Sequence, residues 1–280
     1  DYHGKIGNDF SYNIAGNIST YKNKVLSLGG GTNIPGKTHL GNQVNTMIEP
    51  GKPIGYFYGY KMDGVFQTQE EINNYRGGPD NTIIMPTAEP GDLKFVDLNG
   101  DGKLGEEDRT MIGNPHPDFT FGLTLSGEYK GFDLSMFFQG SVGNDILNIL
   151  KYDIYSGTGW YNAPKDIFDK FWTGPGSTNE NFAISANSRD NLTMSEWYIE
   201  NGSYVRLKNV TLGYTFPKQW VQKLTVQNLR LFVAAQNLFT ITSYSGLDPE
   251  LGNSNPAFMG IDMGWYPQAR SFMVGLSLKL

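Results

Sequence analysis

Hydrophobic and polar residues alternate strictly through the last ten residues of the chain, 271–280. Phe272, Val274, Leu276, Leu278 and Leu280 share one phase, and the residues between them are Met, Gly, Ser and Lys. Successive side chains of a β-strand point to opposite faces, so the pattern predicts a strand with one apolar and one mostly polar surface.

The same alternation recurs in several earlier segments of the chain. It slips by one residue at Lys208–Asn209, which predicts a β-bulge. Only Gly131 and its neighbours separate two of the segments, so these two are expected to form a tight hairpin. The predicted strands lie at 10–20, 54–66, 119–130, 132–143, 203–216, 229–241 and 271–280, with Tyr2–Ile6 as an eighth candidate.

The predicted strands are joined by connections of very unequal length. Short turns on one rim and long loops on the other are typical of outer-membrane β-barrels. Residues 23–53 fit less well, because the strand count places this long segment on the short-turn rim. Helices are predicted near 70–75, 145–153, 164–171 and 219–224. The short connections are 131 and 217–228, and the long loops are 67–118, 144–202 and 242–270.

Composition limits the fold class without deciding it. Aromatic residues make up 14% of the 280 residues, and no stretch approaches 18 consecutive apolar residues, which excludes a transmembrane helix. A barrel strand needs only about 9–11 residues, half of them polar. We therefore expect an all-β antiparallel transmembrane barrel. The alternative is a secreted calcium-bearing β-sandwich that binds glycans, since sandwich strands also alternate.

Charge and motif content narrow the function classes. The net charge of −6 argues against a nucleic-acid partner, which requires a basic surface. The chain has no cysteine, so it has neither a disulfide framework nor a thiolate metal site. Signatures such as G-x-S-x-G and H-E-x-x-H are missing from the sequence, and we expect no enzymatic activity.

One segment, 97–108, matches a calcium-binding loop of the EF-hand type. Oxygen-bearing side chains stand at its positions 1, 3 and 5, glycine stands at position 6, and the carbonyl of position 7 is a further ligand. Position 12 is Asp rather than Glu, which resembles dockerin-type loops. The predicted Ca²⁺ ligands are Asp97, Asn99, Asp101, Lys103 and Asp108.

Several aromatic residues gather in the long segment 144–202. Such side chains either stack on sugar rings, contact a partner, or pack locally within the loop. The candidates for ligand or partner contact are Trp160, Tyr161, Trp172, Trp197 and Tyr198.

Five segments together resemble a known family, the SusC/RagA-type TonB-linked outer-membrane transporters of Bacteroidetes, in their C-terminal region. The resemblance spans nearly the whole of residues 1–280. The segments are PGDLKFVDLNGDG at 90–102, DRTMIGNPHPDFTFG at 108–122, YKGFDLSMFFQG at 129–140, GSYVRLKNVTLGY at 202–214 and AQNLF at 235–239.

The resemblance implies a particular assembly and function. Members of this family have a 22-stranded barrel, a plug and a TonB-interacting segment. A SusD-like surface lipoprotein delivers oligosaccharides or peptides, and TonB energises their import through the outer membrane. This chain is expected to supply the last seven or eight strands, with extracellular loops at 67–118 and 144–202. Its partners would be the remaining strands and plug, TonB, the lipoprotein and outer-membrane lipid.

Overall fold

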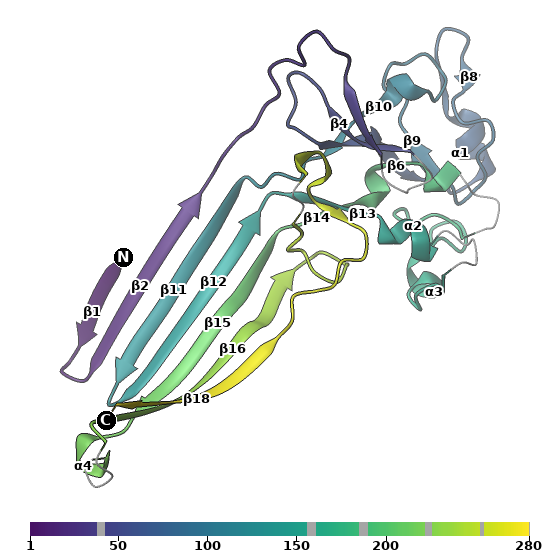
Figure 1. The fold of residues 1–280 in the computed structure, drawn as a ribbon. Helices are drawn as coiled ribbons and strands as arrows, with labels where there is room; N and C mark the ends of the chain where they lie inside the picture. Colours follow the sequence, from purple (N-terminus) through teal and green to yellow (C-terminus); the bar gives the residue numbers. More distant parts are fainter. Residues whose placement is uncertain (38–42, 156–160, 185–189, 222–225, 253–254, 280) are drawn as a thin grey trace.

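Seven long antiparallel strands form one sheet, which we call the wall (Figure 1). The computed structural model describes all residues except 38–42, 156–160, 185–189, 222–225, 253–254 and 280. The strands follow one another across the wall in chain order, as in a meander. They are β1 (Tyr2–Ile6), β2 (Phe10–Ser19), β11 (Phe119–Tyr129), β12 (Phe132–Val142), β15 (Tyr204–Thr215), β16 (Asn228–Thr242) and β18 (Ser271–Lys279).

The strand register brings apolar side chains to one face of the wall and polar side chains to the other. An apolar row crosses all seven strands through Tyr2, Ile14, Leu125, Met136, Val210, Ala235 and Phe272. The adjacent row belongs to the opposite face and consists of His3, Asn13, Ser126, Ser135, Thr211, Ala234 and Met273. A shift of one residue in any strand would exchange the two faces, so the alternation fixes this register.

Six of the predicted strands lie in the wall within about two residues of their predicted ends, and Tyr2–Ile6 joins them at one edge. The predicted bulge is confirmed, because the pairing of β15 with β16 shifts between Leu207 and Asn209. The predicted hairpin is also confirmed. It turns through Lys130 and Gly131, which both have a positive φ.

The prediction for 54–66 is wrong in one respect. The segment does form strands, β5 (Tyr56–Tyr60) and β6 (Met62–Val65), but neither belongs to the wall. The reason is that β5 is buried on both faces, with Tyr56 and Phe57 both inaccessible, whereas wall strands expose one or both faces. As a result, residues 20–118 form a single connection between β2 and β11. The long segment 23–53 therefore lies on the same rim as the other long loops.

The wall has one rim of short turns and one rim of long connections. We call the first, with turns at 7–9, 130–131 and 216–227, the turn rim. The second, which carries 20–118, 143–203 and 243–270, is the loop rim. The described parts of these three connections pack together at the loop rim, and we call them the loop layer (Figure 1).

The loop layer contains four small sheets. The largest joins β10 (Arg109–Gly113), β5, β4 (Val44–Ile48) and β3 (Ile34–Lys37). A second sheet joins strands from all of the later connections: β14 (Ile199–Asn201), β13 (Asp145–Asn148) and β17 (Ile261–Asp262). The other two are the pairs β6 with β9 (Leu93–Phe95) and β7 (Arg76–Gly77) with β8 (Thr82–Ile83).

The hydrophobic core of the described chain lies in the loop layer. Its members come from segments far apart in the sequence, such as Phe57, Phe66, Leu147, Met194 and Ile261, all nearly or fully buried. Burial of this apolar surface stabilises the three connections as one packed body.

Short helices lie in the loop layer and in the 216–227 turn of the turn rim. The predicted helix near 70–75 is confirmed as α1 (Gln69–Asn74), where the Thr68 side chain accepts the N–H of Glu71. The prediction for 145–153 is partly wrong, because its first half pairs as β13 and the helix α2 (Leu150–Tyr155) starts later. The other helices of the described residues are α3 (Ile167–Lys170), α4 (Lys218–Val221) and the 3-10 turns Glu106–Asp108, Asp190–Leu192, Glu196–Tyr198 and Pro256–Phe258.

The sandwich alternative does not agree with this architecture. In a sandwich, a second sheet would cover the apolar face of the first. Here Phe272 and Val274 on that face are each 74% exposed. Within the described ranges, every helix is too short or too polar to cross a membrane.

Candidate functional site

The polar face of the wall is a surface of hydroxyl and carboxamide groups. It carries Asn13 and Asn17 on β2, Thr124 and Ser126 on β11, and Gln139 on β12. Among the described residues of this face, charged side chains occur only near the two rims. The charged positions are Lys5, Glu128, Asp133, Arg230 and Lys279 near the turn rim and Arg206 and Lys208 near the loop rim.

An ion pair spans three strands of the polar face near the turn rim. Arg230 on β16 makes a bidentate contact with Asp133 on β12, with a distance of 2.9 Å from Nε to Oδ1. Gly213 of β15 lies between these strands, and a Cβ atom there would come within 2.6 Å of both partners. Glycine therefore leaves open the space through which the two side chains meet, and a larger residue would force them to shift.

A second ionic network fastens the loop layer to the polar face near the loop rim. Arg206 of β15 is only 3% exposed and pairs with Asp248 and Glu250, both at 2.5 Å. Lys208 adds a contact of 2.8 Å to Glu250. A buried pair of this kind costs desolvation, which the charge-assisted hydrogen bonds offset when every group is satisfied. The 243–270 connection is thus held against the polar face of the wall near the loop rim.

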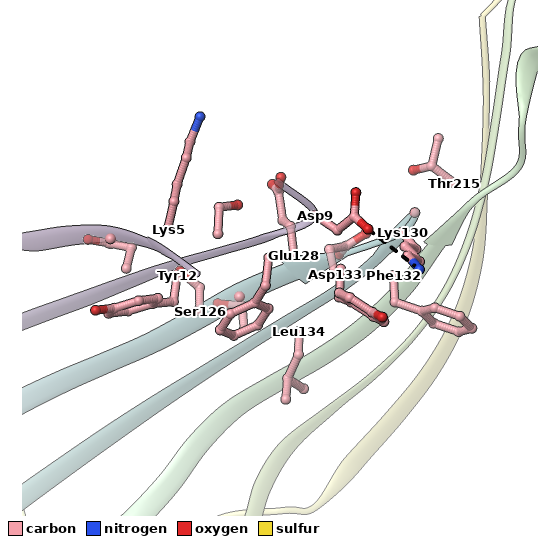
Figure 2. Close-up of a pocket in the computed structure, with 18 of the residues that line it drawn as sticks. Lys5, Asp9, Tyr12, Ser126, Glu128, Lys130, Phe132, Asp133, Leu134 and Thr215 are labelled. Atoms are coloured by element: carbon pink, nitrogen blue, oxygen red, sulfur yellow. Dashed lines mark ion pairs between the residues drawn. The ribbon is translucent and has the colours of Figure 1, made fainter. Parts of the chain in front are cut away.

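A polar hollow of about 1100 Å³ lies at the turn rim. Its walls come from β1, β2, β11 and β12 and the turns between them. Figure 2 shows Lys5, Asp9 and Glu128 on one side of the strands and Tyr12 and Leu134 on the other. Lys130 pairs with Asp9 at 3.5 Å, but both side chains are well exposed, so this pair adds little stability.

The predicted calcium loop forms a compact turn between β9 and β10. Side-chain oxygens of Asp97, Asn99 and Asp101 accept backbone N–H groups of residues two to five positions later, at 2.7–2.9 Å. Such local bonds stabilise the turn without a helix on either side. The loop also contacts the β7–β8 hairpin, since the Thr82 hydroxyl donates to the carbonyl of Gly102 at 2.9 Å.

Gly102, at the sixth position of this loop, is required by both conformation and space. Its φ of +84° lies in the left-handed region that favours glycine. A Cβ atom would also lie 2.4 Å from the carbonyl oxygen of Gly77. The glycine that the calcium motif prescribes is therefore explained by the turn itself.

Asp108, the last predicted calcium ligand, is fully buried. Its carboxylate accepts the N–H groups of Leu98 at 2.8 Å, Asn99 at 3.3 Å and Gly105 at 2.7 Å. Among the described residues, no three acidic or histidine side chains converge in a geometry that would hold a metal ion. The loop thus has the predicted ligand types in the predicted order, with their carboxylates bonded to backbone N–H groups.

The aromatic residues predicted to contact a ligand separate into buried and exposed members. Trp197 and Tyr198 lie in the core of the loop layer, and Trp172 packs against the same core. Their side chains are therefore accounted for by packing. Tyr161 is exposed and stays a candidate. Trp160 lies outside the described residues.

Sequence reasoning did not identify the exposed aromatic pair Trp265–Tyr266, which follows β17. Tyr266 is 91% exposed. The buried carboxylate of Asp262 accepts the N–H groups of Gly264 at 2.8 Å and Trp265 at 3.2 Å, which orders the turn that presents the pair. The segment between Pro256 and Pro267 has no periodic pattern, so only the tertiary structure reveals these contacts.

Two largely buried carboxylates hold the 243–270 connection: Glu200 bonds to Ser245 of that connection, and Asp248 fastens it to Arg206 of the wall. Burial alone would raise the pKa of Glu200, but Lys151 at 3.0 Å and hydrogen bonds from Ser245 and Asn148 hold that pKa below its usual value. Burial likewise opposes ionisation of Asp248, yet the N–H of Gln268 and the guanidinium of Arg206 lower its pKa. Both groups are therefore ionised at neutral pH.

The chain is similar to part of several known receptors. It is 37% identical over 285 residues to TonB-dependent receptor P3 of Formosa agariphila, covering 97% of this chain and 27% of that protein. It is 28% identical over 287 residues to TonB-dependent receptor SusC of Bacteroides thetaiotaomicron, covering 98% of this chain and 25% of SusC. The chain thus spans about a quarter of the length of the curated relatives it matches. No protein-family model matches the chain.

Solved structures agree with these sequence relationships. The structure described as the RagAB peptide transporter superposes with a TM-score of 0.72 at 22% identity, over 99% of this chain and 28% of that one. The RagAB peptide importer in its 'open-open' state gives a TM-score of 0.71 at 20% identity. At these identities the likeness concerns the fold alone.

The class of protein follows from the wall and these superpositions: the chain is a portion of a transmembrane β-barrel, with the apolar face of the wall toward lipid and the polar face toward the lumen. Its sequence relatives then define the group more closely. The predicted resemblance to SusC/RagA-type TonB-dependent receptors is confirmed, and the chain corresponds to part of the barrel of such a receptor.

Proposed function

We propose that the complete protein, of which this chain is a part, imports a nutrient across the outer membrane of a Gram-negative bacterium. The sequence relatives named TonB-dependent receptor support this proposal. We infer that TonB supplies the energy through a part of the protein beyond this chain, and that a SusD-like surface lipoprotein covers the loop rim. This chain supplies wall, loop layer and lumen surface, without enzymatic chemistry.

The substrate we propose is a neutral oligosaccharide. The observation that carries this choice is the polar face of the wall, where the side chains between the two rims are hydroxyl, carboxamide or apolar groups. Such groups exchange hydrogen bonds with sugar hydroxyls without fixing a charge. A path for charged peptides would favour charged side chains along its middle. The charges at Arg206 and Lys208 are already paired with Asp248 and Glu250.

Growth tests decide between the two substrate classes. A strain lacking the complete gene is grown on single oligosaccharides and, separately, on peptide mixtures as sole carbon source. Loss of growth on an oligosaccharide alone, restored by the wild-type gene, supports the proposal. Loss of growth only on peptides contradicts the substrate class, and unchanged growth on all sources contradicts import. Co-purification of a surface lipoprotein with the tagged protein tests the proposed partner.

We also propose that the loop 97–108 binds one Ca²⁺ ion in the complete protein. The support is the order of ligand types Asp97, Asn99, Asp101, Lys103 and Asp108 and the turn that the loop adopts. The convergence of three carboxylates that a bound ion needs is not present in the described residues. Binding therefore requires that the ion replace some of the N–H contacts of these oxygens. The ion would pin the loop against the β7–β8 hairpin.

Calcium titration of the purified protein tests this site. The double variant Asp97→Asn, Asp101→Asn should bind one Ca²⁺ fewer than the wild type and lose the calcium-dependent rise in its unfolding temperature. Glu107→Gln is the matched control, because it removes an acidic side chain of the same loop outside the ligand set. Equal calcium binding by all three proteins would contradict the proposal.

A further inference from the structure

The aromatic ring of Phe137, on β12, lies in the middle of the polar face of the wall. Phe137 stands directly opposite Thr124 of β11 and Asn209 of β15, which both belong to this face. Its nearest neighbours of the same phase on β12 are polar, Ser135 and Gln139. An apolar side chain thus occupies a position, halfway between the two rims, where the alternation of the strand otherwise places polar groups.

Packing on the wall accounts for only part of the Phe137 ring. The ring leans toward Gly122 of β11, where a Cβ atom would lie 3.2 Å from its Cε2 atom. The carboxamide of Asn17 approaches the same glycine from β2, with its Nδ2 atom 2.9 Å from that Cβ position. Ring and carboxamide thus meet above Gly122, and Phe137 remains partly exposed. A leucine would cover the glycine as well, so covering the backbone does not by itself require an aromatic residue.

Four carboxamide side chains surround this ring on the polar face. Two of them stand in the row of Gly122, and the other two stand in the row of Phe137. Their side chains have no hydrogen-bond partner among the described residues, so their donors and acceptors are free to bind a molecule in the lumen. The four residues are Asn17, Gln139, Asn209 and Gln236.

This arrangement matches the two kinds of surface that a sugar presents. A pyranose ring has C–H groups on its faces and hydroxyl groups at its edge. The C–H face stacks on an aromatic ring, and each carboxamide both donates to and accepts from hydroxyl groups. The one charged residue of the two rows, Arg206, is already paired with Asp248 and Glu250. A neutral sugar unit therefore meets no uncompensated charge beside the ring.

We propose that Phe137 is the stacking platform of an oligosaccharide-binding subsite halfway along the lumen. One pyranose unit stacks on the ring, and the carboxamides of Asn17, Gln139 and Asn209 bind its hydroxyl groups. Neighbouring strands lie about 4.8 Å apart and alternate residues about 6.6 Å apart, so the ring and these groups are spaced for a single sugar unit. This inference rests on the proposed import of a neutral oligosaccharide, and it assigns the wall residues that recognise the sugar.

Calorimetric titration of the complete protein in detergent tests the subsite. The probes are neutral hexasaccharides of glucose, xylose, mannose and galactose, each used separately. Phe137→Leu keeps an apolar cover on Gly122 but removes the aromatic face. It should bind the sugar that the wild type binds about tenfold more weakly. Phe137→Tyr keeps the aromatic face and should retain the wild-type affinity. Asn209→Ala removes a carboxamide beside the ring and should weaken binding several-fold.

Phe232→Leu is the matched control. Phe232 of β16 also belongs to the polar face, and its ring covers Gly275 of β18. Its direct neighbours in register are Gly213 and Gly275 rather than carboxamides, and the guanidinium of Arg230 lies 5.1 Å from the centre of its ring. The same substitution at this second lumen ring should therefore leave sugar binding unchanged.

The outcomes separate the subsite from the substrate class. Unchanged heat-modifiable mobility on gels shows that each variant has folded. A folded Phe137→Leu protein that binds the sugar as tightly as the wild type would overturn the subsite and leave the substrate class standing. Equal losses from Phe137→Leu and Phe232→Leu would also overturn the subsite, because the carboxamides beside Phe137 would then confer nothing. A wild type that binds none of the probes would overturn the substrate class and the subsite together.

Discussion

The wall and the loop layer place their apolar side chains in opposite environments. In the loop layer, Phe57, Phe66 and Leu147 are fully buried against residues from other connections. In the wall, Phe272 and Val274 are among the most exposed large apolar side chains of the chain. The loop layer is therefore held together as a water-soluble protein is, by its own core. The wall is held by its ladder of backbone hydrogen bonds and by lipid as its solvent.

Stability in the two regions therefore responds to different kinds of substitution. Removing volume from the loop core leaves a cavity, whereas shortening a side chain that faces lipid leaves space that hydrocarbon fills. A charged substitution should destabilise the lipid-facing side of the wall more than the surface of the loop layer, because that surface meets water.

The largest effect is expected from a cavity in the loop core. Trp197→Ala removes a buried ring that packs 4.9 Å from those of Phe182 and Tyr198, and should destabilise the loop layer by about 3–5 kcal/mol. Hydrogen exchange of the full protein should show faster exchange in the loop layer and unchanged protection in the wall. Trp265→Ala, at an exposed tryptophan, is the control. Equal protection in both variants would show that the loop layer is not one cooperative body.

A charge on the lipid-facing side of the wall should have the next largest effect. Val233→Lys introduces an ammonium among apolar side chains and should cost about 2–4 kcal/mol, as charged substitutions near the bilayer midplane do. Ala234→Lys, one residue later, points to the lumen and should have little effect. The yield of heat-modifiable, folded protein in lipid vesicles measures both. A larger loss from Ala234→Lys would contradict the assignment of the two faces.

The turn before β10 should depend on a single buried carboxylate. Asp108→Ala leaves the N–H groups of Leu98, Asn99 and Gly105 unpaired and should destabilise the loop layer by about 1–3 kcal/mol. Asp101→Ala removes an exposed carboxylate of the same loop and should change stability by less than about 0.5 kcal/mol. Thermal unfolding in the presence of a calcium chelator separates this effect from metal binding. Equal shifts of the unfolding temperature for both variants would contradict the special role of Asp108.

The smallest effect is expected from acid. The folded-state pKa values of Glu200 and Asp248 lie below their unfolded values, so their contribution is complete above the unfolded pKa values of about 4. It is lost as the pH falls through the lower, folded pKa values. Limited proteolysis between pH 7 and pH 3 should therefore show that the loop layer opens before the wall does. Glu200→Gln should flatten this dependence, and a dependence that steepens above pH 5 would contradict it.

Much of the wall was predictable because its pattern is local. The alternation in 119–130 and 132–143 and the turn at Gly131 defined a hairpin to within a residue of its ends. The slip at Lys208–Asn209 located a bulge for the same reason. Each of these features follows from neighbours along one strand, which the sequence displays directly.

The candidate sites were less predictable, because they depend on contacts between distant segments. The ligand order of 97–108 was readable, but the bonding of Asp108 to three N–H groups was not. Trp197 and Tyr198 were candidates for ligand contact, partner contact or local packing, and they lie in the core, since only the fold brings Phe171 and Phe182 to Trp197. The ion pair of Asp133 with Arg230 joins residues 97 positions apart across Gly213.

By itself, the sequence determined that this chain forms long amphipathic strands, which of their faces is apolar, and that the family is one of membrane barrels. Only the tertiary structure decided which strands enter the wall. Residues 54–66 alternate much as the wall strands do, but β5 is buried on both faces and pairs with β4 and β10. The alternation of apolar and polar side chains reflects only the environments on the two faces of one strand. Membership of a sheet depends instead on backbone partners that lie far away in the chain.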